Sequence, residues 1–219
     1  MLRKLTRDFT FTASADDIKN ETMVFSASPE FAYRNGGTWT RNAVHLLENI
    51  GAFDDTDNIV IDTRVHMLMP GMLPAIGGWH CDAIPRGDDG QPDFSRRDVI
   101  DHIRHYLLIV DAGTGALTEF LAQTPDEFPQ SPPPSGKTVW GHHSELIEGF
   151  LADGSLQKTA VESGHLYQFS ARDYHRAIPA TGSGWRFFLR ASVNTMTRGP
   201  LNEIRNQVQV YLPSEHLGW

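Results

Sequence analysis

The sequence predicts a mainly β protein, a barrel or sandwich with helices at its margins. Many short segments rich in Val, Ile and aromatic residues are separated by turn signals, and only two segments show clear helical spacing. The chain has 219 residues, of which 40% are hydrophobic. One β-rich domain of this length is ordinary, and it can bury a sizeable core.

The elements follow in order along the chain. Residues 1–57 are predicted to be an N-terminal extension, polar and irregular up to residue 37, with a helix from Thr40 that packs on the barrel and ends at Gly51. The barrel core is predicted to span 58–195, with 196–219 as a C-terminal segment. A second helix is expected at 140–151. Strands are expected at 9–12, 58–69, 75–82, 105–110, 116–122, 159–161, 166–169, 185–193 and 207–212.

Turns and loops complete this pattern. The turn signal Asp111-Ala-Gly-Thr-Gly115 predicts that 105–110 and 116–122 pair as a hairpin. The stretches 83–97 and 124–136 are long and rich in Gly, Pro and charged residues. Long loops are often lids or binding loops, so we expect these two to cap the barrel mouth and set substrate choice.

Composition narrows the classes of function. The net charge of −8 argues against nonspecific nucleic-acid binding, which depends on Lys and Arg. A single cysteine, Cys81, allows no internal disulfide and suits a reducing compartment. The N-terminus resembles no signal peptide, and the apolar runs are too short to span a bilayer. The sequence therefore predicts a cytoplasmic protein without a membrane partner.

A possible metal site begins at His80-Cys81-Asp82. In a strand, side chains at i and i+2 point to the same face, so His80 and Asp82 can offer ligand atoms to one point while Cys81 faces away. Such a pair is common by chance, and a structural hydrogen bond at a strand end is the alternative. A third ligand would complete the facial triad of two His and one carboxylate, which leaves metal positions open for other ligands.

The second half of the chain supplies the other members of the pattern. His175 follows a predicted strand and a short loop, and Arg186 and Arg190 lie on one face of the next strand with Phe188 between them. A buried guanidinium is costly unless it meets an anion, and its planar shape suits a carboxylate. That anion is either a ligand or an internal acidic side chain.

Taken together, His80, Asp82, His175 and Arg186 resemble the HxD…H…R signature of the iron(II)/2-oxoglutarate-dependent dioxygenase superfamily. The resemblance covers roughly residues 60–195 and implies a double-stranded β-helix, the jelly-roll or cupin-like barrel. It implies that His80, Asp82 and His175 hold Fe(II), that 2-oxoglutarate and O2 are co-substrates, and that Arg186 binds the far carboxylate of 2-oxoglutarate.

The same resemblance suggests further site residues. The Arg186 and Arg190 pair is similar to the taurine dioxygenase branch, where the second arginine meets an anionic substrate; which of the two binds 2-oxoglutarate stays open. A hydroxyl on the strand at 116–122 often helps to hold 2-oxoglutarate, which makes Thr118 the candidate and Tyr106 its rival. Trp79 and Tyr174 are candidates for substrate contact, although aromatic residues near a site are more often core.

Three functions compete on this pattern. The leading one is a 2-oxoglutarate oxygenase that hydroxylates a small molecule, an anionic one if Arg190 contacts it. The others are a cupin-type metalloprotein that does not use 2-oxoglutarate, and a non-catalytic jelly-roll binding or structural module. The cluster His142-His143-Ser-Glu145 lies in a predicted helix, where i and i+2 diverge, so it is a weak metal candidate. Structural roles are expected for His66, His102 and His105, although His66 could instead support the metal ligands.

Overall fold

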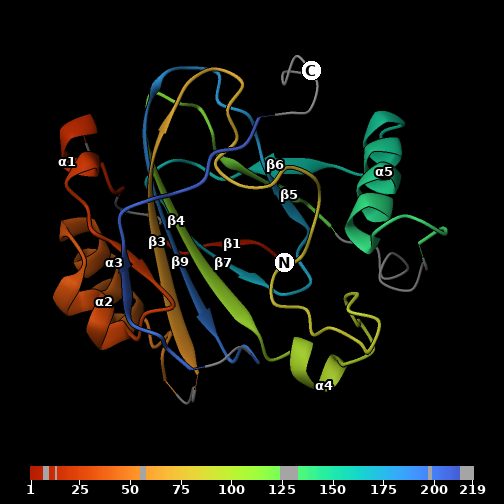
Figure 1. Ribbon diagram of the computed structural model, residues 1–219, viewed down its shortest axis with the longest axis horizontal. Coiled ribbons are helices and arrows are strands. Elements are labelled where there is room, and N and C mark those ends of the chain that lie inside the picture. Colours follow the sequence, from red (N-terminus) through yellow and green to blue (C-terminus); the bar gives the residue numbers. More distant parts are fainter. Residues whose placement is uncertain (7–9, 13, 55–57, 124–132, 197–198, 213–219) are drawn as a thin grey trace.

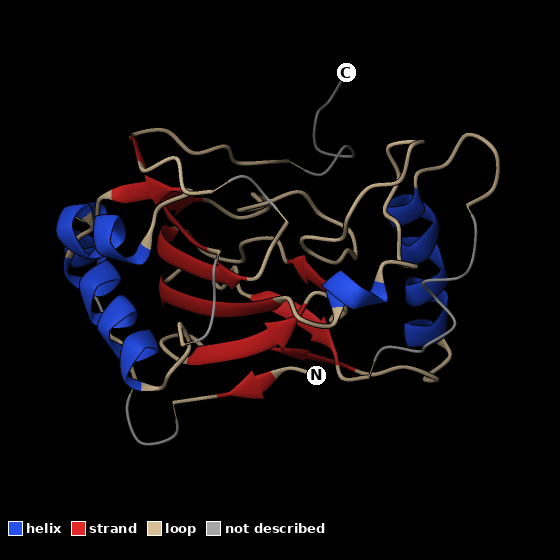
Figure 2. Cartoon of the chain, turned by 90° about the horizontal axis from the view of Figure 1, so that it is seen from below, coloured by secondary structure: helices blue, strands red, loops and turns tan. Residues whose placement is uncertain are grey.

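Two antiparallel sheets face each other, and helices lie on their outer sides (Figures 1 and 2). The computed structural model describes the chain except residues 7–9, 13, 55–57, 124–132, 197–198 and 213–219. The larger sheet has the order β1 (Arg3–Lys4), β7 (Leu166–Ser170), β4 (Arg104–Ala112), β9 (Gly184–Val193), β3 (Ile59–Leu68). The smaller sheet has the order β6 (Lys158–Ala160), β5 (Thr118–Leu121), β8 (His175–Ala177).

The chain passes back and forth between these sheets. After β3 in the larger sheet, His80 bridges to His175 of β8 and so joins the smaller one. The chain then enters β4 in the larger sheet, β5 and β6 in the smaller, β7 in the larger, β8 in the smaller and β9 in the larger. This alternation makes the fold mainly β and jelly-roll-like, as predicted. Within the described residues no strand of one sheet pairs with the other, so closure into a barrel stays a prediction.

Helices α1 (Ala15–Lys19), α2 (Pro29–Asn35) and α3 (Thr38–Asn49) cover the outer face of the larger sheet (Figure 1). The apolar face of α3 packs on that sheet through Val44 and Leu47, which are fully buried. Gly37 has no side chain to cap α3, and the carboxylate of Glu21 instead accepts hydrogen bonds from the backbone N–H groups of Trp39 and Thr40 in the first turn. The predicted helix from Thr40 is thus confirmed.

The remaining elements flank the two sheets. Helix α5 (Val139–Ala152) lies outside the smaller sheet, and α4 (Arg97–Ile100) is a single turn before β4 (Figure 1). Strands β2 (Met23–Phe25) and β10 (Glu203–Arg205) form a separate ribbon. No helix in the described part of the chain is long and apolar enough to cross a membrane.

Alternation along the strands of the larger sheet separates an apolar face from a functional one. On β9, Phe187 and Leu189 point to the helices, while Arg186, Phe188 and Arg190 point between the sheets, as predicted. On β3 the inward residues are Asp62, Arg64 and His66, which stand opposite Arg190, Phe188 and Arg186. The space between the sheets is therefore lined by charged groups where these strands meet.

Several predicted elements are wrong. The first 37 residues are not irregular, since they contain β1, α1, β2 and α2. No strand lies at 10–12 or 207–212, and residue 9 is outside the described residues; a single bridge joins Leu73 to Tyr211 instead. The hairpin is also wrong, because the turn after Asp111 carries the chain to the other sheet, where β5 pairs with β6 and β8. A turn signal fixes the reversal but not the partner.

Candidate metal centre

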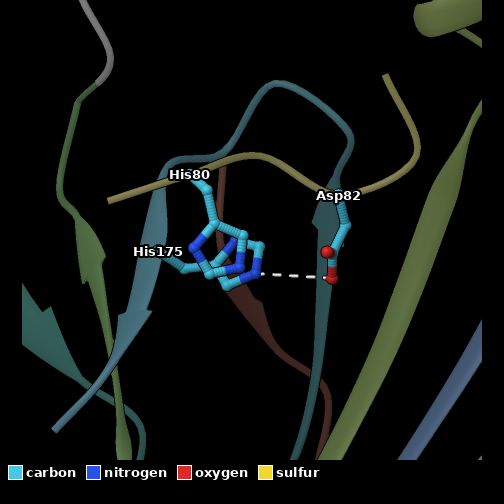
Figure 3. A group of neighbouring side chains, drawn as sticks. All are labelled: His80, Asp82 and His175. Carbon is cyan, nitrogen blue, oxygen red and sulfur yellow. Dashed lines mark ion pairs between the residues drawn. The ribbon is translucent and has the colours of Figure 1, made fainter. Parts of the chain in front are cut away.

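His80, Asp82 and His175 come together between the sheets, as the sequence predicts (Figure 3). One ligand atom from each residue lies within 4.8 Å of the others, and the three are the only such group among the described residues. His175 Nε2 is 3.4 Å from Asp82 Oδ2, and the two imidazole ring centres are 4.6 Å apart. Two imidazoles and one carboxylate on one point are the donor set of a facial triad.

Backbone carbonyls fix the tautomers of both histidines. His80 Nδ1 lies 2.9 Å from the Gly78 carbonyl oxygen, and His175 Nδ1 lies 3.0 Å from that of Asp173. A carbonyl can only accept, so each Nδ1 carries the proton and donates it. With its proton on Nδ1, each ring in its neutral form presents the lone pair of Nε2, which is how proteins orient metal-binding histidines. Burial, reinforced by His175, lowers the pKa of His80, which favours this neutral form.

Asp82 is held in place by Arg190. Arg190 Nη1 donates to Asp82 Oδ2 at 2.6 Å, and its Nη2 donates to Asp62 Oδ2 at 3.2 Å. Burial is the strongest single effect and opposes ionisation of Asp82, but Arg190, His175 and His105 together outweigh it and keep the pKa of this carboxyl well below its usual range. The same two carboxylates raise the pKa of Arg190. Asp82 is thus an oriented, ionised carboxylate. The guanidinium of Arg190 is already paired with Asp62 and Asp82.

The local backbone differs from the predicted strand at 75–82. Only the bridge from His80 to His175 is regular there, with backbone hydrogen bonds of 3.0 Å in both directions. Gly78 has φ +96°, a conformation that other residues rarely adopt, and it interrupts the extended backbone just before the first ligand. His80 and Asp82 converge because a bridge and an ion pair hold them, not because a strand aligns them.

A cavity of about 260 Å³ adjoins the triad, and Arg186 lies in its wall. The Arg186 side chain is 2% exposed, and its Nε donates to the Ala116 carbonyl at 2.7 Å. No carboxylate of the described residues lies within ion-pair distance of it. Burial lowers the pKa of Arg186 to about 9, against the weaker opposing effect of Asp111. A buried guanidinium in this state calls for an anion, and the cavity is where one can enter.

Two further basic residues line the cavity. His66, directly opposite Arg186, is 1% exposed, and burial lowers its pKa to about 3. Arg64 is half-buried and has no ion-pair partner among the described residues. The sequence favours a core role for His66 over one that supports the metal ligands, and it assigns no role to Arg64 or Asp62. Their alternation on one face of a predicted strand was the available signal, since three polar residues cannot all be buried against apolar core.

The other predicted site residues fare differently. Thr118 is buried and lines the cavity, as its proposed role requires. Tyr106 does not: alternation along β4 places it in the apolar cluster under the helices, on the opposite face of the sheet. Because neighbours on a strand point to opposite faces, Leu107 occupies the cavity wall in its place. Tyr106 is therefore a wrong choice.

Trp79 and Tyr174 are core residues on the outer side of the smaller sheet. Both are fully buried in one cluster with Cys81 and Ile147. Trp79 Nε1 donates to Glu148 Oε1 at 2.8 Å, and the Tyr174 hydroxyl is 2.6 Å from His143 Nδ1. Neither lines the cavity that holds the triad and Arg186. The side chains next to the metal ligands His80 and His175 point away from that cavity. Trp79 does line a second pocket, which also reaches His80 and Asp82, so a substrate contact by Trp79 or Tyr174 stays a prediction.

The remaining histidines and loops have other surroundings. Glu145 pairs with Lys137 at 2.5 Å and His143 bonds Tyr174, and within the described part of the chain the cluster at 142–145 forms no group of metal-ligand atoms. His105 Nδ1 is 2.8 Å from Ser192 Oγ. Loop residues Ala83, Ile84, Arg86 and Pro92 line a second pocket that also reaches His80 and Asp82. Most of the loop at 124–136 lies outside the described residues.

Comparisons with known proteins give one kind of match. No family model matches the chain, and no curated protein sequence matches it. Solved structures similar to it include an N-substituted L-amino acid dioxygenase from Burkholderia ambifaria in complex with alpha-KG, with 12% identity, TM-score 0.39, and coverage of 87% of this chain and 80% of that one. The Kdo hydroxylase KdoO, a non-heme Fe(II) alpha-ketoglutarate dependent dioxygenase, has 12% identity, TM-score 0.43, and coverage of 86% and 78%.

A third similar structure is AviO1 from Streptomyces viridochromogenes, with 17% identity, TM-score 0.38, and coverage of 77% of this chain and 66% of that one. Similarity at this level assigns no chemistry to the chain by itself. The metal centre stands on its own geometry.

Proposed function

We propose that this protein is an iron(II)- and 2-oxoglutarate-dependent oxygenase that hydroxylates a small molecule, with Fe(II) held by His80, Asp82 and His175. The observation that carries the proposal is the pair of fixed tautomers. Both imidazoles give Nδ1–H to backbone carbonyls, so both Nε2 lone pairs are available beside an ionised carboxylate. This donor set suits iron(II) and leaves coordination positions for other ligands. The proposal includes closure of the two sheets into a barrel.

Arg186 and Thr118 are proposed to hold 2-oxoglutarate. Arg186 is a buried cation without a carboxylate partner among the described residues, in the wall of the cavity that reaches the triad. It would bind the far carboxylate, and the buried Thr118 hydroxyl would add a hydrogen bond. Bound iron and 2-oxo acid supply the oxidising chemistry with O2, while these side chains orient the co-substrate and the apolar residues Leu107, Phe169 and Phe188 exclude water.

The prime substrate is proposed to be a small anion. Arg190 was the expected contact, but Asp62 and Asp82 already engage its guanidinium. Arg64 is the better candidate, since it lines the cavity, is half-buried and has no ion-pair partner among the described residues. A panel of small carboxylates and phosphates, each paired with a neutral amide or ester, would test this. Anions alone should stimulate 2-oxoglutarate turnover, and Arg64→Gln should remove the preference; equal stimulation by the neutral compounds contradicts it.

The test of the class is an anaerobic titration of the purified protein with Fe(II) and then 2-oxoglutarate. Chelation of the 2-oxo acid is expected to give a weak visible charge-transfer band, and His175→Ala should abolish both metal binding and the band. His142→Ala is the matched control, because that histidine lies outside the triad. Iron binding without a band would favour a cupin-type metalloprotein. Absence of metal binding would leave a non-catalytic jelly-roll module.

A further inference from the structure

His66 is a buried polar side chain that lacks a hydrogen-bond partner. Its ring is 1% exposed, and neither Nδ1 nor Nε2 makes a hydrogen bond in the structure. The Pro74 carbonyl raises the pKa of the ring slightly, yet it does not reach hydrogen-bond geometry with either nitrogen. Leaving a buried polar group unpaired costs about 1–3 kcal/mol, so such a group needs an explanation.

The position of His66 points to a ligand. It stands directly across from Arg186 in the pairing of β3 with β9, and both side chains line the cavity that holds the triad. Two positive groups, Arg186 and Arg64, act on the ring, and together with burial they keep it neutral. A neutral imidazole still has one N–H to donate. The group that would accept it next to a guanidinium is an anionic oxygen.

We propose that His66 is a positioning residue for the co-substrate, donating a hydrogen bond to the same far carboxylate that Arg186 binds. This inference rests on the proposed function. A carboxylate has two oxygens and several lone pairs, so it accepts from a guanidinium and an imidazole together. The neutral ring adds a directed donor without adding charge. His66 therefore selects for 2-oxo acids that carry a second carboxylate at the distance of Arg186.

The experiment measures binding rather than turnover. Anaerobic calorimetry follows 2-oxoglutarate binding to the Fe(II)-loaded wild type, His66→Leu and His66→Gln, with 2-oxopentanoate as the ligand that lacks the far carboxylate. The control is His45→Leu, an exposed position on α3. We expect His66→Leu to weaken 2-oxoglutarate binding about ten-fold or more, as for loss of a hydrogen bond to a charged group. His66→Gln should retain most of the affinity, and binding of 2-oxopentanoate should not change.

Thermal unfolding without metal or ligand separates a binding role from a structural one. Leucine removes two unpaired nitrogens, so His66→Leu should not lower the melting temperature. Equal 2-oxoglutarate affinity in wild type and His66→Leu would overturn the inference. The inference would also be overturned if His66→Leu had a lower melting temperature and bound 2-oxoglutarate and 2-oxopentanoate more weakly by the same factor. If the wild type binds iron but not 2-oxoglutarate, the proposed function fails first, and this result is distinct from the other two.

Discussion

Arg186 and Arg190 lie on the same face of strand β9, yet the charges around them differ. Arg190 is bridged by Asp62 and Asp82, which raise its pKa. Arg186 has no ion-pair partner among the described residues, and burial lowers its pKa to about 9. An arginine that is paired with carboxylates orients other protein groups, whereas one without an ion-pair partner is available to an anionic ligand. The charge around each residue, and not its identity, separates the two roles.

The largest expected effect is on 2-oxoglutarate affinity. Arg186→Ala should weaken binding of 2-oxoglutarate to the Fe(II) protein by roughly thirty-fold or more, since truncating one partner of a buried charge pair costs about 2–5 kcal/mol. Metal stoichiometry should stay unchanged. The matched variant Arg190→Ala should change the 2-oxoglutarate affinity far less once metal is bound. Anaerobic calorimetry checks both, and a larger loss in Arg190→Ala would reverse the two assignments.

The next effect concerns stability and metal binding. Arg190→Ala leaves Asp62 and Asp82 without a counter-charge, which should lower the free energy of unfolding of the metal-free protein by about 3 kcal/mol. Added Fe(II) should recover part of this loss by neutralising Asp82. Urea unfolding with and without metal measures it. Arg186→Ala serves as the comparison and should be neutral or stabilising, because it removes a buried charge that lacks an ion-pair partner among the described residues.

A pH dependence follows from His66. Its folded-state pKa of about 3 lies below the usual 6.5, so between these values the unfolded chain binds a proton that the native chain does not. Stability is therefore complete above about pH 6.5 and falls as the pH drops, by up to about 1.4 kcal/mol per pH unit. Urea titrations from about pH 7 to pH 5 should show a shallower fall in His66→Leu. Burial also lowers the pKa of His105 to about 3, so the stability of the His66→Leu variant should still fall as the pH drops, but less steeply than that of the wild type.

The smallest effect compares two hydroxyl groups. Thr118→Val should weaken 2-oxoglutarate binding by about ten-fold. This corresponds to the loss of one of the weaker hydrogen bonds to a charged group. Tyr106→Phe should leave that affinity unchanged, because its side chain packs under the helices. Both substitutions are close to isosteric, so a change in Tyr106→Phe alone would contradict the orientation of β4.

Much of the fold was predictable from local patterns. The long alternating segments became β3, β4 and β9, and helical spacing located α3 and α5. Short elements were not predictable, because β1, β2 and β10 have only two or three residues and depend on distant partners. The hairpin after Asp111 failed for the same reason. A turn motif is local, whereas the choice of a partner strand is a property of the whole sheet.

The sequence by itself determined which residue types could form a metal centre: His80, Asp82, His175 and the two arginines on one face of a strand. The tertiary structure decided the rest. It showed that backbone carbonyls, rather than a strand, orient the ligands. It also showed that Arg190 forms ion pairs with Asp62 and Asp82, and that Arg186 and His66 face the cavity. Charge pairing and burial depend on residues more than a hundred positions apart, such as Arg190 and Asp62, and no local pattern contains that information.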